Sequence, residues 1–242
     1  MRALFELAAA SVVGIDHYKA GRNGHDGFHW ELADDLAVAV VCDGCGSGRH
    51  SEVGAKLGAA LIGRELAQRI RAGSDLGPGS ALWRDVPRAA IEQLSLVARG
   101  LSGSLQDAVT DYLLFTIVGV ILTPAETVFF SLGDGVFAVN GEQIELGPYP
   151  DNAPPYLAYA LVDGTTPQLN IERHVATSDL RHVASGTDGA ARLALPAFCE
   201  NDLFFRNPDG LRRALFLMTR SESGGLRDDA TVIALRRRAA AS

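Results

Sequence analysis

The sequence has few cysteines. Only three occur in 242 residues, Cys42, Cys45 and Cys199. This small odd number does not supply a disulfide framework and suits a reducing compartment, so a cytoplasmic protein is expected. Cys42 and Cys45 form a C-x-x-C pair, which is compatible with a redox site or with half of a zinc site. Because no second C-x-x-C or H-x-x-H lies nearby, we favour two small side chains packing near a turn.

Long apolar runs are also missing. No run approaches the ~20 residues that span a bilayer, so no membrane partner is expected. The N-terminal segment MRALFELAAASVVG contains a short apolar stretch that invites a signal-peptide interpretation. Glu6 interrupts this stretch, and no charged segment precedes a clean apolar one. The segment is therefore predicted to be a first β-strand.

Basic charge is scarce as well. The chain has 22 Lys and Arg against 29 Asp and Glu, a net charge of −7 and a pI of about 5.3. Nucleic-acid binding needs clustered basic residues for phosphate contacts. The one basic run, Arg236–Arg238, lies at the extreme C-terminus and is interpreted as a solvated tail. No nucleic-acid partner is expected.

The remaining composition is that of an ordinary globular protein, with 47% hydrophobic and 21% charged residues. No internal repeat or linker is visible, so residues 1–242 are predicted to form a single domain. Apolar residues at helical spacing predict helices over Ser51–Arg71, Trp83–Gly100 and Leu211–Thr219. Strands are predicted at Leu36–Cys42, Tyr112–Leu122, Thr127–Leu132, Gly135–Asn140, Glu142–Leu146, His182–Ser185 and Thr231–Leu235. Because helices and strands are segregated along the chain, the fold class is α+β.

Acidic residues occupy the ends of several predicted strands. Asp43, Asp134 and Asp188 each follow an apolar strand and precede a glycine, and Asp228 and Asp229 immediately precede the last strand. Such acids converge at a sheet edge, and their mutual repulsion is costly unless a cation neutralises it. Ligand sets made of oxygen favour Mg²⁺ or Mn²⁺ over zinc. The alternative is that each Asp-Gly is merely a turn, and the residues alone leave that alternative open.

Five motifs in order add a family resemblance. They read HYKAGRNGHDGF, VVCDGCGSGRHSEVGA, SLGDGVFAVNGE, ASGTDGA and RDDATVIAL, and they cover nearly the whole chain. In this order they resemble the PPM family of metal-dependent protein serine/threonine phosphatases, the type-2C class, and in particular a compact bacterial branch. The segment NAPPYLAYAL is similar to a loop of that branch. The resemblance implies a four-layer αββα sandwich, in which two antiparallel β-sheets are flanked by helices.

The resemblance also implies a ligand set for two Mn²⁺ or Mg²⁺ ions. Asp43 would bridge the two ions, and the Gly44 carbonyl would bind one of them. Asp188 and Asp228 would hold the other, with Asp228 chosen over Asp229 because it is the first acid of the final motif. The implied reaction is in-line attack on phosphorus by a water that the metals activate.

Two further acids complete the implied metal set. Asp26 keeps its place as the acid of the first motif. Asp134 matches the acid that serves a third, weaker metal in some members of the family. Arg192, however, stands four residues after Asp188, where members often carry another third-metal Asp, so the number of metals is left open between two and three.

The chain departs from the family pattern around the first motif. His25 stands where members have Glu or Gln; it could ligate Mn²⁺ or face solvent, and we favour solvent. Gly21 stands where members have the phosphate-binding Arg. Among its neighbours His17, Lys19 and Arg22, we choose Arg22 as the substrate-binding residue, because a guanidinium clamps phosphate in a bidentate way. The alternative is that Arg22 is an ordinary surface arginine.

A second departure concerns the leaving group. Cys45 stands where some members carry a histidine that is thought to act as general acid. A thiol replaces it poorly, so protonation of the leaving group is expected to come from water or from His50. No large flap insertion precedes the Ser-Asp-Gly-like motif, which suggests a broad or unusual choice of substrate.

The leading hypothesis is a cytoplasmic bacterial phosphatase that hydrolyses phosphoserine and phosphothreonine in proteins. Asp43, Asp188 and Asp228 would be its catalytic residues, and phosphorylated proteins its partners, in opposition to a Ser/Thr kinase. One alternative is an inactive regulatory or phosphoprotein-binding module of the same fold. Another is a phosphatase for small phosphorylated metabolites. A redox role for Cys42 and Cys45 is the least favoured.

Overall fold

The strands of this protein form two five-stranded sheets. The structure is a computed structural model that describes residues 1–101, 103–165, 167–221 and 225–239. The strands are β1 Phe5–Val12, β2 Gly27–Leu32, β3 Ala37–Cys42, β4 Ile117–Leu122, β5 Glu126–Leu132, β6 Gly135–Val139, β7 Glu142–Leu146, β8 Asn170–Ala176, β9 His182–Gly186 and β10 Ala230–Arg237. One sheet has the order β1-β10-β9-β6-β7, the other has the order β2-β3-β4-β5-β8, and all neighbouring strands are antiparallel.

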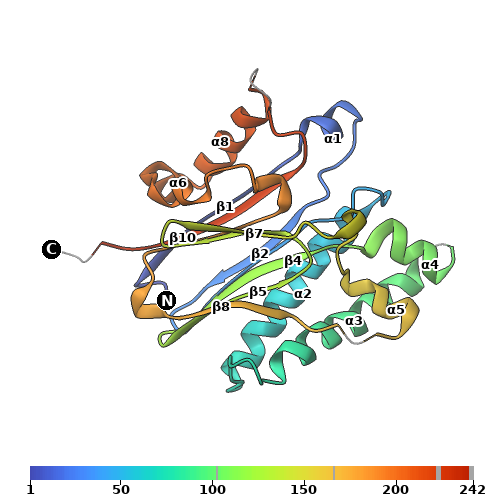
Figure 1. Cartoon of the computed structure of the whole chain (residues 1–242), viewed down its shortest axis with the longest axis horizontal. Helices are drawn as coiled ribbons and strands as arrows, with labels where there is room; N and C mark the ends of the chain where they lie inside the picture. Colours follow the sequence, from blue (N-terminus) through green and yellow to red (C-terminus); the bar gives the residue numbers. More distant parts are fainter. Residues whose placement is uncertain (102, 166, 222–224, 240–242) are drawn as a thin grey trace.

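Helices cover the outer face of each sheet (Figure 1). They are α1 Ile15–Lys19, α2 Ser51–Arg71, α3 Leu82–Gly100, α4 Leu105–Ala108, α5 Ala160–Asp163, α6 Leu195–Glu200, α7 Asp202–Arg206 and α8 Gly210–Thr219. α2 and α3 pack on the β2-to-β8 sheet, and α6 and α8 pack on the other. The predicted four-layer αββα sandwich is confirmed. None of the helices in the described part of the chain is both long and apolar enough to cross a bilayer.

The sequence of β3 is apolar throughout because both of its faces are buried. Val38 and Val40 belong to the core between the sheet and α2, whereas Ala39 and Val41 belong to the core between the two sheets. Successive side chains of a strand point to opposite faces, and here both faces are buried. An uninterrupted apolar run is the consequence. It stops at Asp43, where the chain leaves the sandwich.

The hairpin predictions are confirmed, but one strand boundary is wrong. β4 pairs with β5 across the turn at residues 123–126, and β6 pairs with β7 across Asn140-Gly141, where Asn140 has a φ of 51°. The predicted strand Tyr112–Leu122 instead begins as a π-helix over Val109–Leu113. Both halves of that apolar run are buried against other elements, so hydrophobicity alone gave no sign of where the helix ends.

The sequence analysis did not predict two strands, β2 and β8. Both are edge strands of the same sheet. β8 alternates between exposed and half-buried residues, and its sequence NIERHVA has few apolar side chains. Strands with such a weak apolar signal are recognised mainly by the neighbour they pair with. The short helices α4 to α7 were not predicted either.

Candidate active site

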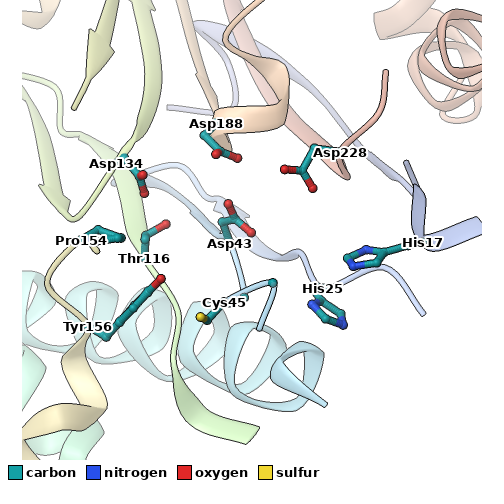
Figure 2. A pocket seen from close by; sticks show the side chains of 12 residues that line it. His17, His25, Asp43, Cys45, Thr116, Asp134, Pro154, Tyr156, Asp188 and Asp228 are labelled. Atoms are coloured by element: carbon teal, nitrogen blue, oxygen red, sulfur yellow. The ribbon is translucent and has the colours of Figure 1, made fainter. Parts of the chain in front are cut away.

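A pocket of 140 Å³ lies at the end of the sandwich near α1, and four acidic side chains line it (Figure 2). Asp43 follows β3, Asp134 connects β5 to β6, Asp188 follows β9, and Asp228 precedes β10. The other lining residues are His17, His25, Gly44, Cys45, Gly46, Thr116, Pro154 and Tyr156. Six residues were predicted as metal ligands, and five of them line this pocket. They are the four acids and Gly44.

Close backbone contacts hold the acid-bearing loops together. A Cβ atom on Gly189 would lie 1.9 Å from the carbonyl oxygen of Asp229, and one on Gly44 would lie 2.7 Å from the carbonyl oxygen of His25. Only glycine allows such an approach. Gly46, by contrast, has no heavy atom within 4 Å of such a Cβ position. Packing therefore requires a glycine at position 44. At position 46 the absence of a side chain leaves open space instead.

The pocket is electrostatically unbalanced. Burial raises the pKa of Asp43 well above its usual range, and the neighbouring carboxylates of Asp26 and Asp188 raise it further. Burial is also the main cause of the raised pKa of Asp228 and of Asp134, and in both cases the charge of Asp188 adds to it. Among the described residues that line the pocket there is no Lys or Arg, and the nitrogen bases are His17 and His25. Each acid therefore gains from a cation placed among them.

The donor set fits a hard divalent cation. Carboxylate and carbonyl oxygens are the ligands that Mg²⁺ and Mn²⁺ prefer, and four carboxylates meet in a volume that admits small species. Among the described residues, no three His, Cys, Asp or Glu side chains are already arranged as a ligand set around one point. The residues fit such an ion by charge and by donor type.

Asp26 lies behind the pocket and does not line it. Its side chain is buried, and its Oδ2 accepts hydrogen bonds from the hydroxyls of Thr187 (2.9 Å) and Thr231 (2.7 Å). Its Oδ1 is buried without a hydrogen-bond partner. Burial raises the pKa of Asp26 to about 8, and the hydrogen bond from Thr231 opposes this rise. The Oδ1 of Asp26, which lies near Asp43, is therefore a further oxygen ligand available to a cation.

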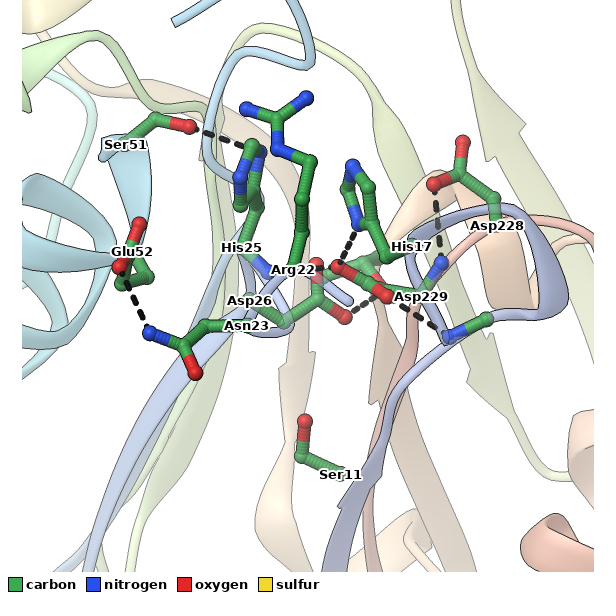
Figure 3. Close-up of polar contacts among 12 residues, drawn as sticks. Ser11, His17, Arg22, Asn23, His25, Asp26, Ser51, Glu52, Asp228 and Asp229 are labelled. Carbon is green, nitrogen blue, oxygen red and sulfur yellow. Dashed lines mark hydrogen bonds and ion pairs between the residues drawn. The ribbon is translucent and has the colours of Figure 1, made fainter. Parts of the chain in front are cut away.

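The neighbours Asp228 and Asp229 point in different directions (Figure 3). Asp228 reaches into the pocket, whereas Asp229 is buried and accepts three hydrogen bonds. Its donors are the backbone N–H groups of Gly14 (2.7 Å) and His25 (2.5 Å) and the Nδ1 of His17 (2.8 Å). Asp229 therefore joins the first motif to the last, and Asp228 is the acid left for the pocket.

His25 does not face solvent, so that expectation is wrong. The residue is 2% exposed, and its Nδ1 lies 2.9 Å from the hydroxyl of Ser51. The Ser51 hydroxyl donates its own proton to the carbonyl of Cys45, so the His25 Nδ1 carries the hydrogen that bonds to Ser51. Burial lowers the pKa of His25, with the charges of His17 and Arg22 adding to the effect.

Arg22 and His50 are not in the pocket lining. The Nη2 of Arg22 donates a hydrogen bond to the carbonyl oxygen of Gly48 at 2.7 Å, which fixes the guanidinium on the loop after β3. The side chain of His50 is 52% exposed and lies near Glu52. Lys19 lines a different cavity, between α1 and α8.

Four lining residues were not singled out from the sequence as principal site residues: His17, Thr116, Pro154 and Tyr156. His17 was considered only as a substitute for the missing arginine, and Tyr156 lies in the NAPPYLAYAL segment. Tyr156 is near Cys45 and forms a hydrogen bond with it. Burial raises the pKa of the Cys45 thiol, but the hydrogen bonds with Ser47 and Tyr156 lower it by more, so the pKa is lowered overall. Thr116 gave no sequence signal, because it lies within an apolar run.

Comparison with known proteins agrees with this geometry. The family model described as "Protein phosphatase 2C" matches residues 13–225, so the chain belongs to the protein phosphatase 2C family. No curated protein matches the sequence closely enough to count as a relative.

Solved structures share the fold at low sequence identity. The serine/threonine phosphatase Stp1 from Staphylococcus aureus is 13% identical with a TM-score of 0.64, over 97% of this chain and 96% of that one. A bacterial serine phosphatase is 14% identical with a TM-score of 0.61, over 98% and 100%. RsbX, solved in complex with magnesium, is 15% identical with a TM-score of 0.51, over 97% and 96%. At these identities the likeness is one of fold.

Proposed function

We propose that this chain is a single-domain, metal-dependent phosphatase of residues 1–242 that hydrolyses phosphoserine and phosphothreonine in proteins. It would act in the cytoplasm of a bacterium and oppose a Ser/Thr kinase. The observation that carries the proposal is the convergence of Asp43, Asp134, Asp188 and Asp228 on one pocket, which no Lys or Arg lines in the part of the chain that the structure describes. Family membership and the fold of the bacterial phosphatases support it.

The pocket acids are the proposed metal holders. Asp43, Gly44, Asp188 and Asp228 would hold two Mn²⁺ or Mg²⁺ ions, with Asp26 behind them and Asp134 available for a third. When bound, such ions supply an activated water for attack on phosphorus and positive charge for the phosphoryl oxygens. RsbX, a structural neighbour, was solved with magnesium.

His17 is the proposed source of the leaving-group proton. Asp229 accepts the Nδ1–H of His17, so the carboxylate fixes the orientation of the ring. In the imidazolium form, the Nε2 would carry a proton on the side of the ring away from Asp229, and His17 lines the pocket. Transfer of this proton to the departing serine oxygen would avoid an alkoxide. His17 thus takes the task that Cys45 performs poorly and for which His50 is not placed.

The test is hydrolysis of p-nitrophenyl phosphate and of a phosphoserine peptide with Mn²⁺, with Mg²⁺ and with EDTA. Wild type is compared with Asp228→Asn and with Asp35→Asn, a matched change of an acid that pairs with Arg71 at the surface. We expect metal-dependent turnover that Asp228→Asn removes and Asp35→Asn leaves unchanged. No turnover of wild type at millimolar Mn²⁺ would refute the proposal.

One observation favours the non-catalytic alternative. Arg22 is engaged with the backbone of the loop after β3 and does not line the pocket, and Gly21 has no side chain with which to bind phosphate. A phosphoprotein-binding module without turnover would bind a phosphoserine peptide and release no phosphate. The same assay, followed by a peptide-binding measurement, separates this alternative from the enzyme.

A further inference from the structure

A second cavity lies between α1 and α8, which are neighbours at one corner of the molecule (Figure 1). This groove has a volume of 470 Å³ and an apolar floor that includes Val12, Ile15 and Phe216. Tyr18 also lines it and is 63% exposed, and Phe216 is 42% exposed. Large aromatic side chains left open to solvent beside an apolar floor are typical of a protein-binding site.

Basic residues form the rim of the groove. Lys19, Arg212 and Arg220 line it, and among the residues that the structure describes no Asp or Glu does. The chain as a whole has a net charge of −7, so this positive rim is a local exception. Arg220 lies over the rings of Tyr18 (5.1 Å) and Phe216 (4.7 Å). Within the part of the chain that the structure describes, neither Lys19 nor Arg220 forms an ion pair, whereas Arg212 pairs with Asp209.

The helix α1 separates this groove from the acidic pocket. Ile15, Tyr18 and Lys19 line the groove, and His17 of the same helix lines the pocket. A helix with its side chains is about 10 Å across. Extended chain covers about 3.3 Å per residue. A substrate whose phosphoserine enters the pocket would therefore reach the groove with residues roughly three to six positions away.

We propose that the groove docks the phosphoprotein substrate, through one apolar side chain on its floor and flanking Asp or Glu residues on its rim. This inference rests on the proposed phosphatase function and names a substrate class for it. The basic rim favours an acidic partner by charge complementarity. Because the groove lies next to His17 of the pocket, we take this partner to be the substrate rather than another acidic protein. The groove supplies binding energy away from the reacting atoms, so it acts on KM and leaves the chemistry of the pocket unchanged.

Two phosphoserine peptides test this. One carries Glu-Leu-Glu about four residues from the phosphoserine, and the other carries Ser-Ala-Ser there. We expect a KM about tenfold lower for the acidic peptide, the equivalent of ~1.4 kcal/mol, with similar kcat. The difference should shrink as salt is raised from 0.05 to about 0.5 M, because salt screens exposed charges.

Arg212→Glu and Arg213→Glu form a matched pair of variants. Both arginines are exposed, adjacent on α8 and bonded to Asp209, but only Arg212 lines the groove. We expect Arg212→Glu to raise the KM of the acidic peptide about tenfold and Arg213→Glu to leave it unchanged. Turnover of p-nitrophenyl phosphate should be the same in both variants, which also reports that both are folded. Arg220→Gln provides a second groove variant.

Several results would overturn the inference. These are equal KM values for the two peptides, an equal effect of the two α8 variants, or a dimer in sedimentation that Arg212→Glu dissociates, which would assign the groove to a second copy. Absence of p-nitrophenyl phosphate turnover in wild type counts against the proposed function instead. In that case, fluorescence anisotropy of the labelled peptides still tests the groove: preference for the acidic peptide supports docking, and no preference refutes it.

Discussion

Acidic side chains at the surface and in the pocket have opposite surroundings. Asp35 receives a hydrogen bond from Arg71 (2.8 Å), and this bond lowers its pKa. Asp43 is buried among other carboxylates, and burial raises its pKa. At the surface Asp35 gains an arginine partner and keeps its contact with water. In the pocket the fold retains a repulsion between carboxylates that destabilises it, and the proposed cation would relieve this repulsion.

The largest expected effect comes from removing a pocket acid. Asp43→Asn and Asp188→Asn should each lower kcat for p-nitrophenyl phosphate by about 10³-fold or more, because each removes a charge that would hold and orient the proposed metals. Asp134→Asn should lower kcat by about tenfold only. The measurement is steady-state turnover with saturating Mn²⁺. Equal activity of Asp43→Asn and wild type would remove the pocket from the mechanism.

The second effect depends on the leaving group. His17→Asn should lower kcat for a phosphoserine peptide by about 10²-fold, the typical gain from general acid catalysis. It should have far less effect on p-nitrophenyl phosphate, whose phenolate leaves without a proton. His50→Asn is the control, because His50 is exposed and outside the pocket. Equal losses on both substrates would show that His17 acts on binding or structure rather than on the leaving group.

A third prediction concerns the stability of the metal-free protein. The raised pKa values of Asp43 and Asp26 mean that the folded state binds more protons than the unfolded state above the ordinary carboxyl pKa of 3.8. Stability should therefore be greatest near pH 4 and fall as the pH rises toward about 8, the pKa of Asp26.

Mutation and metal should both reduce this pH dependence. Asp43→Asn should stabilise the metal-free protein at pH 7 by about 1–2 kcal/mol, and Mn²⁺ should stabilise wild type but not this variant. Thermal denaturation in EDTA and in Mn²⁺, from pH 5 to about 8, measures both effects. A wild type that is insensitive to pH and to Mn²⁺ would contradict the electrostatic account of the pocket.

The smallest effect is expected at the surface. Arg71→Gln removes the partner of Asp35 and Glu31, and the exposed pairs should contribute less than about 1 kcal/mol to the free energy of unfolding. The loss should shrink further at high salt, and turnover should be unchanged. Urea denaturation at low and high salt measures this. A change in the free energy of unfolding larger in magnitude than that of Asp43→Asn would reverse the comparison between the two regions.

Much of the fold followed from local patterns. β3 lies where a continuous apolar run predicts it, α2 spans the predicted Ser51–Arg71, and the Asn140-Gly141 turn forms the predicted hairpin. β2 and β8 could not be predicted in this way, because edge strands have one open side and need little apolar character. The start of β4 was missed because a buried π-helix and a buried strand have the same composition.

The candidate site was predictable only in part. The acids at strand ends indicated a metal site, and the motif order indicated the family, which the match over residues 13–225 shows. The position of Arg22 on the Gly48 carbonyl and the burial of His25 depend on contacts with residues distant in sequence. A pattern of neighbouring residues in the sequence does not indicate contacts of this kind.

By itself, the sequence determined the main helices and most of the strands, the acids that end the strands and the family to which the chain belongs. These follow from side-chain periodicity and from motifs that act over a few residues. Only the tertiary structure decided that Asp229 supports His17, and that α1 has the pocket on one side and a basic groove on the other. The reason is physical: burial, hydrogen bonding and electrostatic repulsion depend on distances between elements that are far apart in the chain.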